Sequence, residues 1–235
     1  MDVTTGKRNL TEPEAFALLG HFGLPIVPHA AAATADEAAA AADRLSYPVA
    51  LKVVSPDILH KTDVGGVALH LADAGAVRRA FADIQAKARA ASPKATLRGA
   101  LVAKMAAAGP EVIIGMTRDA QFGPALMFGL GGIFVEVYKD VAFRLPPLSE
   151  ADARDMIHEI KGLPILTGFR GRPACDLQAI AHCLLAVSRL VEARPDLEEL
   201  DLNPIIAYPT GCLVVDAKVV LRTSDGPGAH AGQRA

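Results

Sequence analysis

Hydrophobic and polar residues along the chain follow two different spacings. Apolar residues at helical spacing, several of them behind a capping Thr, Ser or Asp, predict helices at 11–23, 34–45, 74–91, 149–161 and 176–194. Short apolar runs predict strands at 49–54, 67–71, 99–105, 111–117, 124–129, 133–137, 141–144, 200–206 and 212–221. Helices and strands mixed along one chain predict an α/β (α+β) fold.

The pattern changes near residues 105–110, where helices alternating with strands give way to mostly short strands. This change predicts two lobes, residues 10–105 and 106–222, with a cleft between them where a ligand can bind. Residues 1–9 are expected to be an N-terminal extension. Residues 223–235 are rich in Gly and poor in large apolar side chains, which predicts a disordered tail.

The composition narrows the function classes. Of the 235 residues, 51% are hydrophobic, but no apolar run approaches the roughly eighteen residues that cross a bilayer, and the N-terminus does not resemble a secretory signal. A net charge of −2, three Tyr and no Trp give no support for a nucleic-acid partner. Three cysteines without CxxC spacing predict reduced thiols and argue against zinc. We therefore expect a cytoplasmic protein with no membrane or nucleic-acid partner.

The segment behind the predicted strand at 49–54 carries the most informative polar residues. Lys52 lies in an apolar run, and a buried lysine is costly unless an anion meets it; the alternative is an edge-strand lysine whose ammonium group reaches solvent. His60 is either a surface residue or a nucleophile toward phosphorus. Gly65 and Gly66 either let backbone amides approach an anion or form a simple turn. Together these residues favour a phosphate-binding loop.

Oxygen-bearing side chains near the end of the chain form a second group. Asp201 and Asn203 are two residues apart, so on a strand they point to one face, and Asp216 lies on the next predicted strand. Magnesium bound with a nucleotide typically takes only one or two protein ligands. The alternative is a turn that begins at Asn203 and Pro204. Glu111, at the start of its predicted strand, either faces the cleft or is a solvated strand end.

Several short motifs occur in an order that resembles a known family. They are SPDILHKTDVGGV at 55–67, EVIIG at 111–115, RDAQFGP at 118–124, FGLGG at 128–132, GFRG at 168–171 and DLNP at 201–204. Over about residues 10–222 the chain resembles the ATP-grasp beta subunit of NDP-forming acyl-CoA synthetases, a family that includes the ADP-forming acetyl-CoA synthetases and is related to succinyl-CoA synthetase. The resemblance implies an ATP-grasp fold with the nucleotide between two lobes.

The resemblance also implies roles for individual residues. In this family acyl-CoA, ADP and phosphate are interconverted with an acid, CoA and ATP, and the phosphoryl group moves through phosphohistidine. By the motif match, His60 would exchange that group with ATP or ADP. The implied nucleotide-binding residues are Lys52, Gly65, Gly66, Lys104, Met105 and Glu111. The implied Mg²⁺ ligands are Asn203 and Asp216, with Asp201 as a further candidate.

The partner expected from the resemblance is an alpha subunit. The family's CoA-binding and ligase domains are not in this sequence, so the first histidine and the acyl-CoA site are expected on a separate alpha chain, in a heterotetramer. Two alternatives stay open. One is a stand-alone ATP-grasp carboxylate ligase, which needs no phosphohistidine. The other is a non-catalytic nucleotide-sensing subunit, which binds ATP without being phosphorylated.

Overall fold

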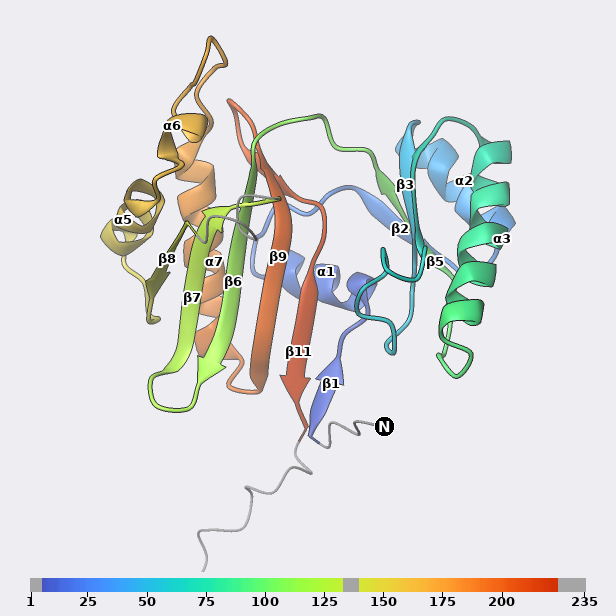
Figure 1. Ribbon diagram of the computed structural model, residues 1–235, viewed down its shortest axis with the longest axis horizontal. Coiled ribbons are helices and arrows are strands. Elements are labelled where there is room, and N and C mark those ends of the chain that lie inside the picture. Colours follow the sequence, from blue (N-terminus) through green and yellow to red (C-terminus); the bar gives the residue numbers. More distant parts are fainter. Residues whose placement is uncertain (1–5, 133–139, 224–235) are drawn as a thin grey trace, which may run out of the picture.

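The computed structural model describes residues 6–132 and 140–223, and it contains two antiparallel sheets side by side (Figure 1). The larger sheet has the order β1 (Lys7–Asn9), β11 (Lys218–Arg222), β9 (Leu197–Ala207), β6 (Glu111–Asp119), β7 (Gly123–Leu130) and β8 (Val141–Arg144), and β10 (Cys212–Val214) also pairs with β9. The smaller sheet has the order β2 (His29–Ala32), β5 (Ala100–Lys104), β3 (Val49–Val53) and β4 (Val67–Leu71).

One face of the larger sheet is covered by helices. These are α1 (Glu12–His21), α5 (Glu150–Glu159), the short α6 (Leu163–Leu166) and α7 (Leu177–Ala193). Alternate residues of β6, such as Ile114, face the core, and α7 buries residues at helical spacing that include Ile180, Leu184 and Val187. Burial of these two stripes against each other forms the larger of two hydrophobic cores.

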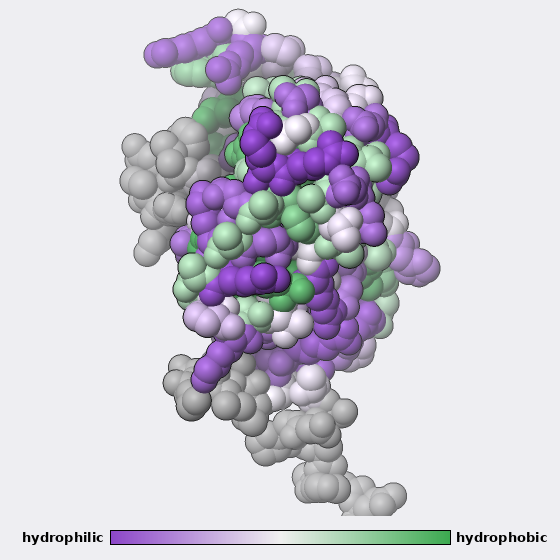
Figure 2. Space-filling view, turned by 90° about the vertical axis from the view of Figure 1, so that its right-hand side faces the viewer, coloured by the Kyte–Doolittle hydropathy of each residue, from purple (hydrophilic) through white to green (hydrophobic). Residues whose placement is uncertain are grey.

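The smaller sheet is covered by α2 (Ala35–Leu45) and α3 (Ala74–Ala91). The buried side of α2 consists of alanines, which let the helix approach the sheet closely. Figure 2 looks onto the side of the molecule that carries these helices, and it is mostly hydrophilic. Alternation along β3 places Leu51 and Val53 in this core and turns Ala50 and Lys52 to the opposite face.

The N-terminal segment packs with the larger sheet before the chain enters the smaller one. β1 pairs with β11, and Phe16 and Leu19 of α1 lie in the larger core. Further along, Val27 N donates to Val214 O at 3.0 Å. The lobe limits of 10–105 and 106–222 remain a prediction, but this packing favours counting α1 with the second lobe. In Figure 1, α1 lies between the two sheets.

Most predicted elements occur in the structure, among them the strands at 67–71 and 141–144 and the helix at 74–91. The prediction of one strand at 212–221 is wrong. The ladder is interrupted after Val214, where Asp216 Oδ1 accepts a hydrogen bond from Ala217 N at 2.9 Å, and pairing resumes at β11. The short elements β1, β2 and α6 were not predicted. The predicted strand at 133–137 and the predicted tail beyond residue 223 lie outside the described residues.

Asp176 joins α7 to the turn between β9 and β10. Its carboxylate accepts hydrogen bonds from Ala179 N at 3.0 Å, as the helix cap, and from Gly211 N at 2.9 Å. We expect Asp176→Ala to lower the free energy of unfolding by about 1–2 kcal/mol, measured by urea denaturation. Asp176→Asn keeps a capping oxygen, so it should lose less. Equal losses in the two variants would contradict this account.

The stabilisation by Asp176 should depend on pH. The hydrogen bonds from Gly211 N and Ala179 N hold the pKa of its carboxyl below the usual value. A lowered folded-state pKa means that the stabilisation is present above the unfolded pKa and is lost as pH falls through the folded pKa. The difference in stability between the wild type and Asp176→Ala should therefore shrink below about pH 4. A difference that is constant from neutral pH into this range would contradict the assigned cause.

Candidate active site

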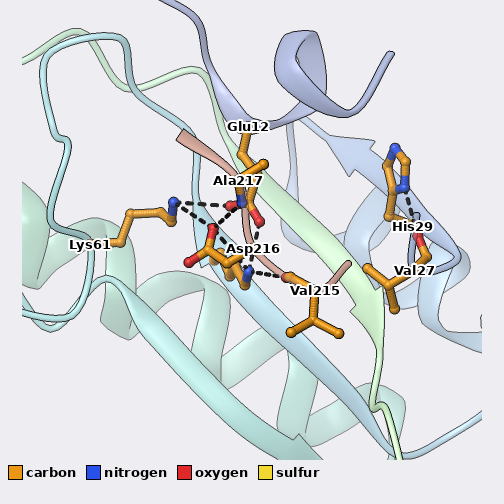
Figure 3. Close-up of polar contacts among 8 residues, drawn as sticks. Glu12, Val27, His29, Lys61, Val215, Asp216 and Ala217 are labelled. Atoms are coloured by element: carbon orange, nitrogen blue, oxygen red, sulfur yellow. Dashed lines mark hydrogen bonds and ion pairs between the residues drawn. The ribbon is translucent and has the colours of Figure 1, made fainter. Parts of the chain in front are cut away.

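Four charged side chains meet where the two sheets approach each other (Figure 3). We call Glu12, Lys52, Lys61 and Asp216 the charged quartet. Lys52 Nζ donates to Glu12 Oε1 at 2.6 Å and to Val215 O at 2.8 Å, and Lys61 Nζ lies 3.1 Å from Glu12 Oε2. Asp216 Oδ1 lies 3.5 Å from Lys52 Nζ and 3.4 Å from Lys61 Nζ. Each lysine therefore faces both carboxylates.

The quartet is largely removed from water. The side chains of Glu12, Lys52 and Lys61 are 3%, 10% and 14% exposed, whereas that of Asp216 is 35% exposed. Burial raises the pKa of Glu12, and the lysines only partly offset this effect. Burial acts in the opposite direction on Lys61, but Glu12 and Asp216 outweigh it and raise the pKa of the ammonium group. Burial also opposes ionisation of Asp216, but Lys52 and Lys61 lower its pKa.

Different parts of the chain supply the four residues. Glu12 is the first residue of α1, which packs on the larger sheet, and Asp216 lies between β10 and β11. Lys52 belongs to β3 of the smaller sheet, and Lys61 lies in the loop that follows. The quartet therefore forms ion pairs between the two halves of the fold. Both lysines come from one half and both carboxylates from the other.

An apolar pocket of about 280 Å³ opens beside the quartet. Lys52 and Asp216 lie in its wall. The remaining lining residues are mostly apolar: Val27, Ala50, Leu69, Ala103, Lys104, Met105, Ala106, Pro204, Ile206 and Val215. An apolar slot that ends at the buried Lys52 fits a ligand with a flat organic group at one end and anionic groups at the other. The structure thus brings the predicted residues Lys52, Lys104, Met105 and Asp216 into one site.

His60 lies on the loop between β3 and β4, next to Lys61. Its side chain is exposed, while its backbone oxygen accepts a hydrogen bond from Asp63 N at 3.2 Å. The loop is held locally, because Gly66 N donates to Lys61 O at 2.7 Å and Val53 N donates to Gly66 O at 2.8 Å. Lys61 then ties the loop to Glu12. An exposed imidazole can act as a nucleophile, and this one directly precedes a lysine of the quartet in the sequence.

Gly65 and Gly66 form a closed turn, the alternative to an anion-binding loop. Their amides donate to Thr62 O at 3.0 Å and to Lys61 O at 2.7 Å, so in this conformation they do not point at a ligand. A Cβ on Gly66 would lie 2.5 Å from Val53 Cγ1 and 3.0 Å from Lys61 O. Glycine is therefore required here by close packing of the turn. Their role as nucleotide ligands remains a prediction that needs another loop conformation.

Two of the predicted metal ligands lie on neighbouring segments, Asn203 in β9 and Asp216 in the break between β10 and β11. Val214 pairs with Ile205, and Val215 N donates to Pro204 O at 3.1 Å, so the antiparallel register places Asp216 opposite Asn203. These two oxygen donors fit a magnesium ion shared with phosphates. In the part of the chain that the structure describes, no group of three or more His, Cys, Asp and Glu side chains is arranged to hold a metal.

Asp201 is the third predicted metal ligand. It pairs with Lys218 across the ladder, and its Oδ1 is buried without a hydrogen-bond partner. Burial raises the pKa of its carboxyl. It lines a separate pocket of about 250 Å³ over the open face of the larger sheet. The metal site that the geometry favours therefore rests on Asn203 and Asp216.

Glu111 lines another pocket, of about 530 Å³, next to the glycine turn at Gly131. Gly131 N donates to Glu111 O at 2.7 Å, and Arg170 and Arg172 lie in the same pocket. The structure thus separates Glu111 from the pocket beside Lys52, although both open near the segment that joins the two sheets. Its predicted contact with a nucleotide remains a proposal.

Sequence reasoning missed Glu12 and gave Lys61 no role. Thr11, Glu12 and Glu14 form a capping pattern, in which Glu14 Oε2 accepts from Thr11 N at 2.7 Å, so Glu12 looked like one more acid in the first turn. The sequence feature that could have indicated a buried acidic partner was Lys52. A lysine buried in a strand requires a carboxylate or a phosphate nearby, although the sequence does not say which acid supplies it.

The fold and the site together define a nucleotide-binding protein of the ATP-grasp class. The family model of the ATP-grasp domain matches residues 3–221, and the chain belongs to this family. Within it, the chain belongs to the beta subunits of ADP-forming acyl-CoA synthetases, as the following relatives show.

The acetate–CoA ligase (ADP-forming) I subunit beta of Pyrococcus furiosus is 44% identical over 91% of this chain and 92% of the relative. The acetyl-coenzyme A synthetase 1 of Ca. Korarchaeum cryptofilum, solved with coenzyme A and Ca-AMPCP, is 44% identical with a TM-score of 0.89 over 92% of this chain and 94% of that one. The 4-hydroxybutyrate–CoA ligase (ADP-forming) of Nitrosopumilus maritimus is 39% identical over 91% of this chain but only 31% of its own length.

No helix in the described ranges is long and apolar enough to cross a membrane.

Close packing of the loop next to Lys61 can be tested with Gly66→Ala. The added methyl group overlaps Val53, so we expect the free energy of unfolding to fall by about 1–3 kcal/mol in a urea titration. Gly20→Ala is the matched control, because Gly20 lies in α1 with nothing within 4 Å of the added Cβ. That change should be neutral or stabilise by up to about 1 kcal/mol. If both variants match the wild type, the turn is not tightly packed.

Proposed function

We propose that this chain is the nucleotide-binding subunit of an ADP-forming acyl-CoA synthetase, an acid–thiol ligase. It transfers a phosphoryl group between ATP or ADP and a phosphohistidine relay, and the relay is coupled to acyl-CoA formation or cleavage on an alpha subunit. The observation that carries the proposal is the placement of His60 next to Lys61, which lies 3.4 Å from Asp216 in the wall of the apolar pocket between the two sheets.

The pocket beside the quartet accounts for nucleotide binding. The adenine lies against the segment of Lys104 and Met105, where the pocket wall is apolar. The phosphates extend toward Lys52 and Lys61, whose ammonium groups are already gathered and largely desolvated. Charges arranged in advance in a site with little water stabilise a phosphate more strongly than the same charges in bulk solvent.

His60 is the residue that accepts the phosphoryl group. A ring nitrogen attacks the terminal phosphorus, a P–N bond forms, and the bond from phosphorus to the bridging oxygen breaks, with the electron pair leaving on ADP. Lys52 and Lys61 balance the negative charge on the phosphate oxygens. Such transfer depends mainly on positioning and electrostatic stabilisation. The reverse reaction returns the group to ADP.

Magnesium fits the donors at the edge of this site. Asn203 and Asp216 would hold it, and Asp201 is the further candidate. A bound Mg²⁺ supplies positive charge that neutralises phosphate oxygens. A relative solved with Mg-AMPPCP, 42% identical to this chain, supports the assignment. Asp216 is also paired with both lysines, so these ammonium groups hold its carboxylate beside the proposed position of the phosphates.

The alpha subunit completes the enzyme. The Pyrococcus furiosus relatives are named as beta subunits, and several longer relatives contain a region similar to this chain as about 30% of their length. One Ca. Korarchaeum cryptofilum structure is described with its phosphohistidine segment pointing towards the nucleotide-binding site. We propose a cytoplasmic heterotetramer in which the alpha subunit supplies the CoA-binding and ligase domains and exchanges phosphate with His60.

Transfer to His60 can be tested with ATP labelled at the terminal phosphate. With Mg²⁺ and the alpha subunit present, the chain should gain a label that is labile in acid and stable in base, and His60→Asn should abolish it. His182→Asn, an exposed histidine on α7, is the control and should keep the label. A label that persists in His60→Asn points to another acceptor, and ligase activity that persists in that variant points to a stand-alone ligase. ATP binding with no label, even when acyl-CoA, phosphate and the partner are added, favours a nucleotide sensor.

The metal assignment predicts a defect that depends on magnesium. Asn203→Ala should raise the Mg²⁺ concentration needed for half-maximal ATP binding at least about tenfold, a loss of about 1.4 kcal/mol, because it removes one of two protein oxygens. Binding measured with EDTA should change little, since Asn203 carries no charge that would attract or repel the phosphates. Titration calorimetry gives both values. An unchanged Mg²⁺ requirement would exclude Asn203 as a ligand.

A further inference from the structure

The Glu12 side chain takes no part in the capping hydrogen bonds of its own helix. Thr11 and Glu14 close the N-terminal cap between them, with Glu14 Oε2 accepting from Thr11 N at 2.7 Å and from Thr11 Oγ1 at 2.8 Å. The Glu12 carboxylate leaves the helix start and enters the junction of the two sheets, where it is 3% exposed. A buried carboxylate is costly without partners, so its position depends on the lysines that it meets.

The two carboxylate oxygens of Glu12 contact different lysines. Oε1 accepts the 2.6 Å hydrogen bond from Lys52, which is fixed on β3. Oε2 lies 3.1 Å from Lys61 Nζ but makes no well-directed hydrogen bond. The Lys61 contact is therefore the more adaptable of the two. Lys61 directly follows His60, so any force on this lysine also acts on the loop that presents the imidazole.

The charges of the quartet are balanced only while no nucleotide is bound. Two ammonium groups face two carboxylates, and the phosphates of ATP add several negative charges to the same space. Like charges at short distance repel, so Glu12 disfavours the phosphates that the lysines attract. The residue that orders the loop should therefore also weaken nucleotide binding.

We infer that Glu12 is a positioning residue: it holds Lys61, and through it the loop of His60, at the junction of the two sheets, at the expense of affinity for ATP. This inference rests on the proposed function. A substitution that merely disrupts the site would lower both the affinity for ATP and the rate of phosphoryl transfer, whereas this inference predicts opposite changes. Loss of the Glu12 charge should improve nucleotide binding while it slows phosphoryl transfer.

Glu12→Gln tests the inference, because the amide keeps the size of the side chain and removes its charge. The dissociation constant of ATP, measured by titration calorimetry on the full chain, should fall at least about fivefold. Trypsin cleavage after Lys61, followed by mass spectrometry, should become at least about tenfold faster because the lysine is no longer held. Labelling of His60 at saturating ATP, with the alpha subunit present, should be at least about tenfold slower.

Glu14→Gln is the matched control, two residues along the same helix. Glutamine can close the same cap, and the ion pairs of Glu14 with Arg8 and Arg98 are at the surface. We expect all three quantities to stay within about twofold of the wild type. Glu12→Asp keeps the charge but shortens the reach to Lys61. It should slow transfer and speed trypsin cleavage without improving ATP affinity, and it serves if Glu12→Gln does not fold.

The inference is overturned by unchanged trypsin cleavage and transfer in Glu12→Gln, and equally by weaker ATP binding in that variant. Weaker binding would make Glu12 a support for the nucleotide site and not a competitor. Failure of the proposed function has a different signature. In that case the wild type is never labelled at His60, whereas ATP affinity and trypsin cleavage still report whether Glu12 holds the loop.

Discussion

A lysine in the middle of a buried strand is the constraint on which the rest of the site depends. Lys52 faces the opposite sheet because its neighbours Leu51 and Val53 fill the core of the smaller one. Its side chain is 10% exposed, and at that burial an unpaired charge would cost several kcal/mol. The fold meets this requirement by bringing Glu12 from the start of α1 and the carbonyl of Val215 from the interrupted edge of the larger sheet.

The same requirement prepares the site for a nucleotide. Ion pairs that join the two sheets hold Lys52 in the wall of an apolar pocket with Lys61 close by, which is an arrangement suited to phosphates. Asp216 is held by these lysines opposite Asn203, so the two proposed magnesium ligands lie across from each other. The backbone of His60 is positioned by its neighbour in the sequence, because Lys61 belongs to the quartet. Stability of the junction and readiness for phosphoryl transfer have one physical origin.

The sequence predicted those parts of the structure that depend on local pattern. The helix at 74–91 and the strand at 67–71 were predicted from spacing, and the membership in the ATP-grasp class from motifs in order. The prediction failed where distant segments decide the outcome. Lys52 and Glu12 are 40 residues apart, and no periodicity connects them. The single strand predicted at 212–221 was wrong: the ladder is interrupted near Val215, whose carbonyl accepts a hydrogen bond from Lys52. The turn at Gly65 and Gly66 is closed by backbone hydrogen bonds that residue spacing does not reveal.

Glu12 and Lys61, whose charged groups lie 3.1 Å apart, should be energetically coupled across the junction. A double-mutant cycle with Glu12→Gln, Lys61→Gln and the pair, analysed by urea unfolding without nucleotide, measures this coupling directly. We predict a coupling free energy above about 1 kcal/mol, because each single change leaves a buried charge that the other change relieves. Additive effects within about 0.3 kcal/mol would show that the two side chains are only neighbours, and would contradict the account.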